Sequence, residues 1–289
     1  MVRLMHLGVF DANSGPCSTR EGVERIGLLA EELGYESVWV GEHVLVPSPQ
    51  VPPSPLAPRH PILDPLIGLT FVAAITRRVK LGTGIIILPQ RNPTVLAKQV
   101  ASLDVLSSGR FLLGLGVGYL EPEFRAVGVP LEDRGRRSTE YLEAMRQLWS
   151  ADSPAYDGKY VSFSGIDAYP RPLDRSGPPV VIGGHSEAAH RRAVALGNGW
   201  YGWGLGLEQT EAAVTSLRRA GESVTRPAGL GTLEITVSPP RGHKLDAGVV
   251  AAYAELGVDR LVFLAPPDCD SLDEMAAFVG QHSPRELGL

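Results

Sequence analysis

The chain has 289 residues, of which 44% are hydrophobic and 20% charged, a composition typical of a globular protein with one large core. A formal net charge of −5 argues against partners such as nucleic acid or an anionic membrane. No apolar run approaches the ~20 residues that span a bilayer. The N-terminus lacks a signal-peptide pattern, and Cys17 and Cys269 are too few for a disulfide framework or a zinc site. We therefore expect a cytoplasmic protein.

Short apolar runs alternate with longer amphipathic segments along the whole chain. The first run, 4–9, predicts a strand, and 19–33 predicts a helix because its apolar residues recur at helical spacing and Gly34 follows its end. A second strand is predicted over 37–40. Residues 44–63 contain seven prolines, which exclude a helix interior and a central strand, so this segment is expected to form a long loop.

The same alternation continues to the C-terminus. Asp64 and Pro65 have the residue types preferred at the cap and first position of a helix, which is predicted over 64–76. Further strands are expected at 79–88, 110–117, 180–182, 199–203, 233–237 and 260–264, and a surface hairpin strand at 159–163. Further helices are expected at 92–106, 133–149, 187–196, 207–220, 246–256 and 271–279.

Eight strands in βα order predict a parallel sheet. The number favours closure into a (β/α)8 TIM barrel, an α/β fold of roughly 250 residues, over an open doubly wound sheet. We expect one domain over 1–289, with 44–63 as a mobile, lid-like insertion that covers the barrel mouth.

In a TIM barrel the working residues follow the C-terminal ends of the strands. The second strand leads into Glu42 and His43. A histidine at this edge is placed to exchange protons near neutral pH, and an adjacent carboxylate is placed to orient it. The alternative is a histidine that only hydrogen-bonds a loop backbone.

Glycines interrupt two of the predicted strands. Gly82 and Gly84 in the third strand indicate a bulge or a close approach of the backbone to a planar ring, with tight packing inside the barrel as the alternative. Gly114, Gly116 and Gly118 alternate along the fourth strand and do not open a helix, so the dinucleotide-binding fingerprint does not apply. Because alternate residues of a strand face the same side, these glycines leave one face of the strand without side chains. A ligand or a neighbouring layer of the protein can approach this face.

A third glycine motif, 183–186, lies between a strand and a helix. Its sequence, Gly183-Gly184-His185-Ser186, leaves free backbone amides at a helix N-terminus, where the macrodipole also favours an anion. We interpret the motif as a phosphate site, with a plain βα turn capped by Ser186 as the alternative.

Together these motifs resemble the luciferase-like monooxygenase superfamily, within its branch of probable coenzyme F420-dependent oxidoreductases. The resemblance is dense to about residue 204 and thin beyond it. It is carried by residues 39–43, 81–85, 89–93, 97–99, 103–110, 114–118, 123–124, 134–135, 140–142, 148–149 and 183–186.

The resemblance implies a TIM barrel with a flavin or deazaflavin ring at its C-terminal mouth. It implies a non-proline cis peptide behind the ring, here most similar to Gly84–Ile85. It further implies that Val117 and Gly118 line the cofactor, that Gly183, Gly184 and Ser186 hold its phosphate with His185 among them, and that His43, beside Glu42, serves the proton side of hydride transfer. Tyr119 replaces the acid of members that oxidise glucose phosphates, which argues against such substrates, but its phenol can itself donate a proton.

We therefore expect a homodimeric oxidoreductase that uses F420 to transfer a hydride to or from a small organic substrate. An FMN-dependent monooxygenase that uses molecular oxygen is the first alternative. Both cofactors have a tricyclic ring and a ribityl phosphate, so the motif at 183–186 does not separate them. The second alternative is a non-catalytic flavin- or deazaflavin-binding protein, against which His43 argues.

Overall fold

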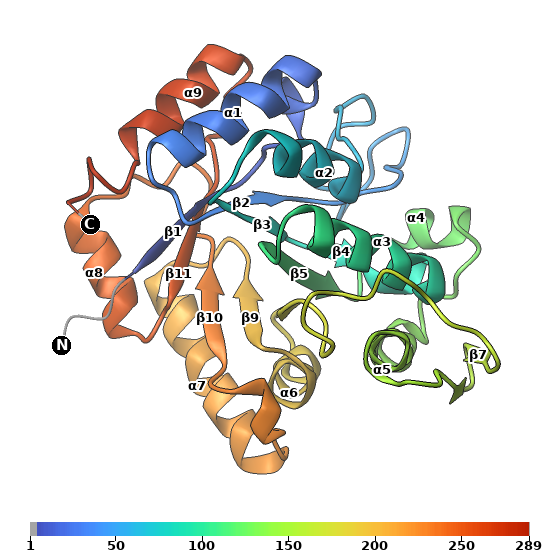
Figure 1. Cartoon of the computed structure of the whole chain (residues 1–289). Coiled ribbons are helices and arrows are strands. Elements are labelled where there is room, and N and C mark those ends of the chain that lie inside the picture. The colour runs from blue at the N-terminus through green and yellow to red at the C-terminus, as the bar shows by residue number, and fades with distance from the viewer. Residues whose placement is uncertain (1–4, 289) are drawn as a thin grey trace.

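Eight parallel strands close into a barrel in the computed structural model, which describes residues 5–288 (Figure 1). β3 pairs with β2 on one side and with β5 on the other, and parallel pairing runs from β2 through β1 around the ring to β5. The barrel is therefore closed, as the sequence predicts. Leu4, where the first strand was expected to begin, lies outside the described residues. The barrel strands are β1 (His6–Val9), β2 (Ser37–Val40), β3 (Lys80–Thr83), β5 (Phe111–Gly116), β8 (Val180–Gly183), β9 (Gly199–Gly202), β10 (Glu234–Val237) and β11 (Arg260–Phe263).

The third predicted strand, 79–88, is not continuous. β3 ends at Thr83, a cis peptide bond joins Gly84 to Ile85, and β4 (Ile86–Ile87) then pairs with the end of β5. The chain continues into a short 3-10 helix, η2 (Leu88–Gln90). The break places the Gly84–Ile85 peptide at the C-terminal mouth of the barrel, at the position that the resemblance indicated.

Helices surround the barrel, and α9 lies beside α1, so the last helix completes the ring next to the first (Figure 1). Six of these helices, α1, α2, α3, α6, α8 and α9, have a side chain that caps the N-terminus. At α2, for example, Asp64 accepts hydrogen bonds from Leu66 N and Ile67 N at 2.9 and 3.1 Å. The helices are α1 (Arg20–Glu32), α2 (Pro65–Ile75), α3 (Pro93–Leu106), α4 (Glu121–Ala126), α5 (Arg134–Ser150), α6 (Glu187–Leu196), α7 (Leu207–Ser223), α8 (Ala247–Glu255) and α9 (Leu272–Gln281).

Three short features complete the chain. The expected surface hairpin forms between β6 (Tyr156–Asp157) and β7 (Ser162–Phe163). Two further 3-10 turns are η1 (Gly15–Cys17) and η3 (Ala228–Leu230). Helix α4 was not predicted, because its six residues are too few to show a helical period.

Alternate strand positions build two apolar clusters. The larger one packs the barrel strands against the surrounding helices. The smaller one includes Trp39 and Tyr201, whose ring centroids lie 5.4 Å apart, with Phe10 above them and Ile85 packed against the cluster. The smaller cluster therefore places aromatic rings next to the Gly84–Ile85 peptide.

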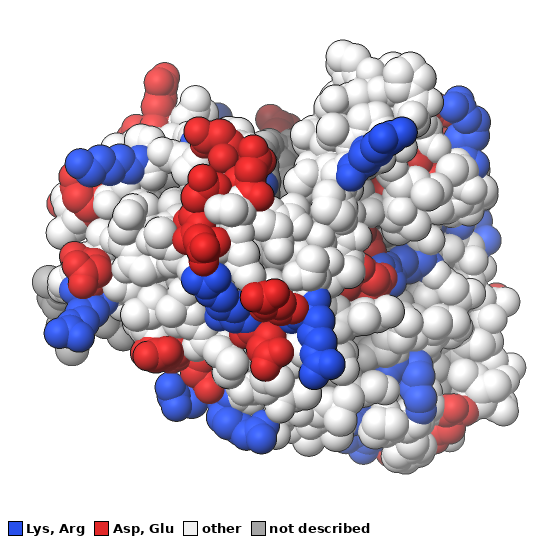
Figure 2. Space-filling view, turned by 90° about the horizontal axis from the view of Figure 1, so that it is seen from above, with Lys and Arg blue, Asp and Glu red and all other residues white. Residues whose placement is uncertain are grey.

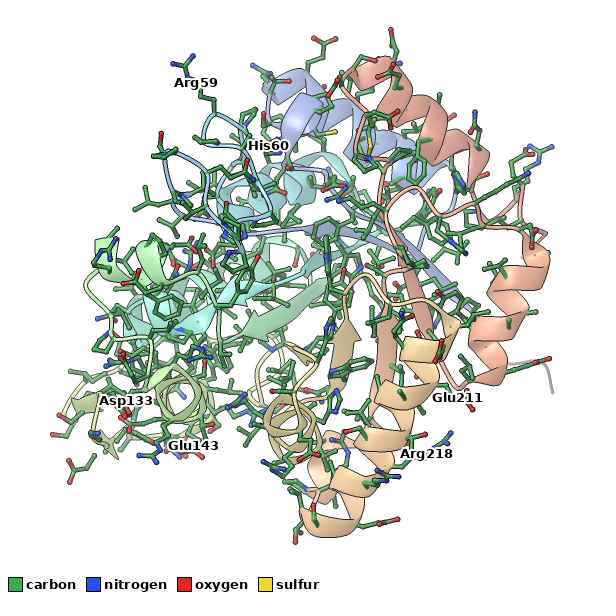
Figure 3. The ribbon with its side chains drawn as sticks, turned by 180° about the vertical axis from the view of Figure 1, so that it is seen from behind. Arg59, His60, Asp133, Glu143, Glu211 and Arg218 are labelled. Carbon is green, nitrogen blue, oxygen red and sulfur yellow. The ribbon has the colours of Figure 1, made fainter. Side chains whose placement is uncertain are left out.

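The proline-rich segment, 44–63, forms an irregular loop as expected. Its end is tied to the loop after β1: His60 Nε2 lies 2.7 Å from Ser14 Oγ, and Leu63 N donates to Asn13 O at 2.9 Å. In Figure 3, Arg59 points away from the molecule, whereas His60 lies toward α1 and α2. That this segment moves and acts as a lid stays a prediction.

The surface mixes charges of both signs. Lysine and arginine side chains are interspersed with aspartate and glutamate on the face seen from above (Figure 2). Asp133 and Glu143 lie near α5, and Glu211 and Arg218 project from α7 (Figure 3). None of the helices within 5–288 is long and apolar enough to cross a bilayer.

Candidate active site

The glycine motifs of three separate strands meet at the barrel mouth. A Cβ atom on Gly116, at the end of β5, would overlap Cδ1 of Ile85, and one on Gly183, at the end of β8, would lie only 2.9 Å from Ile85 Cγ2. Both positions therefore need glycine to admit the Ile85 side chain. The expected cofactor residues Gly84, Ile85 and Gly183 are thus neighbours in space.

The turn after β5 is also shaped by glycine. Gly118 has φ +72°, a left-handed conformation that favours glycine. A Cβ there would lie 2.6 Å from Ile87 Cγ2 and from Phe124 Cε2. Gly118 O accepts a hydrogen bond from Arg134 Nε at 3.2 Å. Val117, beside it, is partly exposed, so this pair of residues borders the same mouth.

The turn before α6 is held by contacts to β9 and the loop that follows it. Gly184 has φ +121°, and its carbonyl accepts from Trp200 Nε1 at 2.8 Å. His185 Nε2 accepts from Trp203 N at 3.1 Å, and burial lowers the pKa of His185, which favours the neutral ring that such an acceptor requires. Ser186 Oγ accepts from Ala189 N at 3.2 Å, so Ser186 caps the helix. Ser186 therefore acts as the cap that the alternative interpretation expects, and that the turn binds a phosphate stays a prediction.

His43 is paired with a buried carboxylate from α4. Its Nδ1 lies 3.2 Å from Oε2 of Glu123, whose side chain is fully buried. Glu123 Oε1 accepts from Val44 N and Leu45 N at 2.6 and 3.3 Å, which fixes the carboxylate against the loop after β2. Because the carboxylate accepts from Nδ1, Nε2 is the His43 nitrogen left to exchange a proton.

Glu42 does not orient His43, contrary to the sequence expectation. Its carboxylate accepts from Ile87 N at 2.5 Å and from Arg91 Nε at 2.8 Å, and Arg91 also binds Asp64 at 2.7 Å. Both carboxylate oxygens of Glu42 are thus bound by partners other than His43. Glu42 therefore ties the end of β2 to β4 and to the cap of α2.

Tyr119 lies beside the histidine. The two rings are edge to face with centroids 6.1 Å apart, and 49% of the Tyr119 side chain is exposed. Burial of the hydroxyl, with the nearby charge of Glu123, raises the pKa of Tyr119 and keeps the phenol protonated. His43, Glu123 and Tyr119 thus form one cluster of titratable side chains at the mouth.

Two functional features escaped the sequence reading. Glu123, four residues after Tyr119, belongs to one of the motifs that carry the resemblance. Nothing in the sequence indicates that its side chain contacts His43. The second is an aromatic and charged part of the rim: Trp203 lies against Phe10 with centroids 4.7 Å apart, and Arg241 covers Trp203 while donating to Asp11 at 2.6 and 2.9 Å.

Comparison with known proteins agrees with this geometry. A family model for luciferase-like monooxygenases matches residues 5–243. The chain belongs to the luciferase-like monooxygenase family. An uncharacterized protein of Mycobacterium bovis is similar at 31% identity over 259 residues, which cover 87% of this chain and 89% of that protein.

Two further proteins differ in their cofactors. An FMNH2-dependent dimethylsulfone monooxygenase of Pseudomonas putida is 31% identical over 148 residues, which cover 50% of this chain and 40% of that enzyme. The structure of an F420-dependent secondary alcohol dehydrogenase in complex with an F420–acetone adduct superimposes with a TM-score of 0.75 at 16% identity, over 98% of both chains, which shows a shared fold. Proteins similar to this chain thus include both F420-dependent and flavin-dependent oxidoreductases.

Proposed function

We propose that the protein is an F420-dependent oxidoreductase that transfers a hydride between the deazaflavin and a small organic substrate. The observation that carries the proposal is the His43–Glu123 pair, which lies at the mouth of a barrel whose rim also holds the Gly84–Ile85 peptide. A histidine held by a buried carboxylate is suited to proton exchange beside a hydride acceptor or donor.

The residues at the mouth fit a tricyclic cofactor. Gly116 and Gly183 let the Ile85 side chain lie against the ends of β5 and β8, and this packing leaves the Gly84–Ile85 peptide at the mouth, where a flat ring would lie against it. Val117 and Gly118 would border the ring, and the turn 183–186 would hold the phosphate at the N-terminus of α6. When bound, the deazaflavin supplies the carbon that gives or accepts the hydride.

The chain itself supplies the proton chemistry. Glu123 holds Nδ1 of His43 and fixes the orientation of the ring, so Nε2 is the nitrogen free to give a proton to the substrate or take one from it. The phenol of Tyr119, protonated and half exposed, provides a second donor beside it. The rings of Trp203 and Phe10, which contact each other edge to face, would offer an apolar surface to the substrate.

A flavin-dependent monooxygenase is the second candidate, because half of the chain is 31% identical to an FMNH2-dependent enzyme. A protein that binds the cofactor without turnover is the third, and the His43–Glu123 pair argues against it, since a storage protein needs no group that exchanges protons.

One experiment separates the three candidates. The purified protein is titrated with F420 and with FMN, and turnover of each reduced cofactor is followed with and without oxygen against a panel of small ketones, alcohols and enones. The proposal expects tighter binding of F420 and oxygen-independent turnover. Oxygen-dependent turnover of reduced FMN would instead establish the monooxygenase, and binding without turnover the non-catalytic protein.

We further propose a homodimer. Exposed apolar side chains lie on two neighbouring helices: Ile67 of α2 is 72% exposed, and Val95 and Leu106 of α3 are 55% and 64% exposed. Burial of these apolar side chains against a second copy of the chain would stabilise a dimer. Light scattering of the eluted protein and of an Ile67→Glu variant tests this assembly.

A further inference from the structure

Trp203 lies across the barrel mouth from His43. Trp203 follows the C-terminal end of β9, and His43 follows that of β2. In the closed ring, β3, β5 and β8 separate these two strands on one side, and β1, β11 and β10 separate them on the other. The two strands are therefore diametrically opposite, so a small molecule bound beside His43 extends toward Trp203.

The indole ring of Trp203 is directed toward the inside of the mouth. It lies edge to face against Phe10 and Tyr201, with centroids 4.7 and 6.3 Å apart. These two buried rings pack in turn on Gly84, where a Cβ would lie 2.6 Å from Phe10 Cε2 and 2.8 Å from Tyr201 Cε1. A continuous apolar surface therefore runs from the Gly84–Ile85 peptide to Trp203.

Polar contacts hold Trp203 in this position. The guanidinium carbon of Arg241 lies 5.6 Å from the centroid of a Trp203 ring, and such a cation–π contact orients the indole. Arg241 is itself fixed, because it donates to both carboxylate oxygens of Asp11 at 2.6 and 2.9 Å. The backbone of Trp203 is held by the hydrogen bond from its N to His185 Nε2. The indole would lose its contacts with Arg241 and Phe10 if it swung into solvent.

Trp203 differs from the other tryptophans of the chain in its exposure. It is 37% exposed, whereas Trp39, Trp149 and Trp200 are at most 2% exposed. An aromatic ring that stays exposed and fixed at the mouth of an enzyme barrel is suited to bind the flat face or edge of another ring. Trp203 is therefore the part of the aromatic surface that a ligand can contact.

The charge beside the indole is already neutralised. Arg241 and Asp11 form a pair with two hydrogen bonds, and their side chains are 35% and 12% exposed. A guanidinium that faces both oxygens of a carboxylate offers little net charge to an anionic ligand. An uncharged ligand therefore fits this part of the mouth better than an anion.

We propose that Trp203 selects the substrate by binding a flat, uncharged ring, so that the substrate is a neutral alcohol or carbonyl compound that carries an aromatic ring. The inference rests on the proposed function, whose substrate class it names. The oxygen of the substrate lies on the side of His43, and its ring lies against the indole. Arg241 and Asp11 are positioning residues that hold the indole in place.

The test compares three alcohols as probes. Benzyl alcohol and cyclohexylmethanol have the same carbon count and differ in the flatness of the ring, and para-(hydroxymethyl)benzoate adds a negative charge to the first. Dissociation constants are measured by calorimetric titration of protein saturated with reduced F420, which takes no hydride from an alcohol, and again without cofactor. We expect benzyl alcohol to bind about two- to tenfold more tightly than cyclohexylmethanol, and the benzoate to bind about tenfold more weakly than benzyl alcohol.

Variants assign this ring preference to residues. Trp203→Leu should bring the ratio of the two constants close to one, whereas Trp203→Phe should retain most of the preference. Arg241→Gln should lower it and Arg241→Lys, which keeps a cation over the ring, should retain part of it. Tyr169→Leu is the matched control, because Tyr169 is 68% exposed and is also covered by an arginine, Arg171, but lies in the segment between β7 and β8. It should keep the wild-type ratio.

Acrylamide quenching of tryptophan fluorescence gives a readout that needs no turnover. Because the other three tryptophans are buried, the quenchable emission comes from Trp203. Bound benzyl alcohol should lower the quenching of the wild type and leave that of Trp203→Phe unchanged. Without ligand, Arg241→Gln should be quenched more strongly than the wild type, since its indole is no longer held.

The outcomes separate this inference from the proposed function. If the wild type binds F420 but none of the probes, or binds both neutral alcohols equally, or if folded Trp203→Leu keeps the preference, the inference is wrong and the proposed function stands. Tighter binding of the benzoate, lost in Arg241→Gln, would assign the site to an anionic substrate and also overturn it. If the preference depends on Trp203 but F420 does not bind, the proposed function fails and the ring-binding role of Trp203 stands.

Discussion

His43 and Glu123 lie 80 positions apart in the sequence, yet Nδ1 of His43 is 3.2 Å from Oε2 of Glu123. The contact joins the loop after β2 to the short helix α4 after β5. Because Glu123 also accepts from two backbone amides of the 44–63 segment, it holds the histidine and the start of that segment in one arrangement.

Glu123→Gln should separate positioning from structure. The amide keeps the shape of the carboxylate but loses its charge and one of its two acceptor oxygens, so the hydrogen bond that orients His43 is weakened. We expect turnover to fall roughly 10- to 100-fold, with cofactor affinity within a few-fold of wild type and a changed pH–rate profile. Turnover and profile of wild type and Glu123→Gln are compared; an unchanged profile together with a lowered Tm would make Glu123 purely structural.

Glu42→Gln should act on stability. Its side chain is 1% exposed and that of its partner Arg91 16%, so the substitution removes the buried counter-charge of Arg91 and leaves only the partly exposed Asp64. Because Arg91 keeps this second partner, the cost should lie at or below the lower end of the roughly 3–5 kcal/mol for breaking a buried pair. Urea unfolding measures this, with Glu121→Gln, which breaks the exposed pair with Arg125, as the control; that change should stay within about 0.5 kcal/mol. If Glu42→Gln barely changes the free energy of unfolding but strongly lowers turnover, Glu42 acts in the reaction and not in stability.

His185→Gln should remove a pH dependence. The pKa of His185 is lowered by burial, so the folded state prefers the neutral ring. The stability that this preference contributes is present above the unfolded pKa of about 6.5 and is lost as the pH falls below it. Gln offers Oε1 to Trp203 N at every pH. Between pH 7 and pH 5 the free energy of unfolding should therefore fall less in His185→Gln than in wild type, and equal slopes would show that His185 makes no such contribution. His185 and His243 are both exposed residues, and His243→Gln, which removes a histidine without the contact to Trp203, serves as the control.

The sequence predicted the parts of the fold that repeat. Eight apolar runs in βα order gave the closed barrel, and Asp64 before Pro65 marked a helix start that the structure confirms. Strand ends also indicated where the glycine motifs meet. These signals are local, so a single sequence reveals them.

Contacts between distant segments did not follow from the sequence. Glu123 lies on a helix too short to show periodicity, and its partner is fixed only by the closure of the barrel. The expectation that Glu42 orients His43 was wrong because it rested on their adjacency in the chain. The side chains of adjacent residues can point to opposite sides.

The single-turnover rate of His43→Ala with reduced F420, compared with that of the wild type, tests the central claim most directly. Removing a general acid or base costs typically 10²- to 10⁴-fold in rate. The account predicts a loss of that size, with cofactor affinity within a few-fold of wild type and a nearly unchanged Tm. A variant that loses several degrees of Tm but keeps its rate, or one that loses only cofactor binding, would contradict the assignment of His43 as the proton-transfer residue.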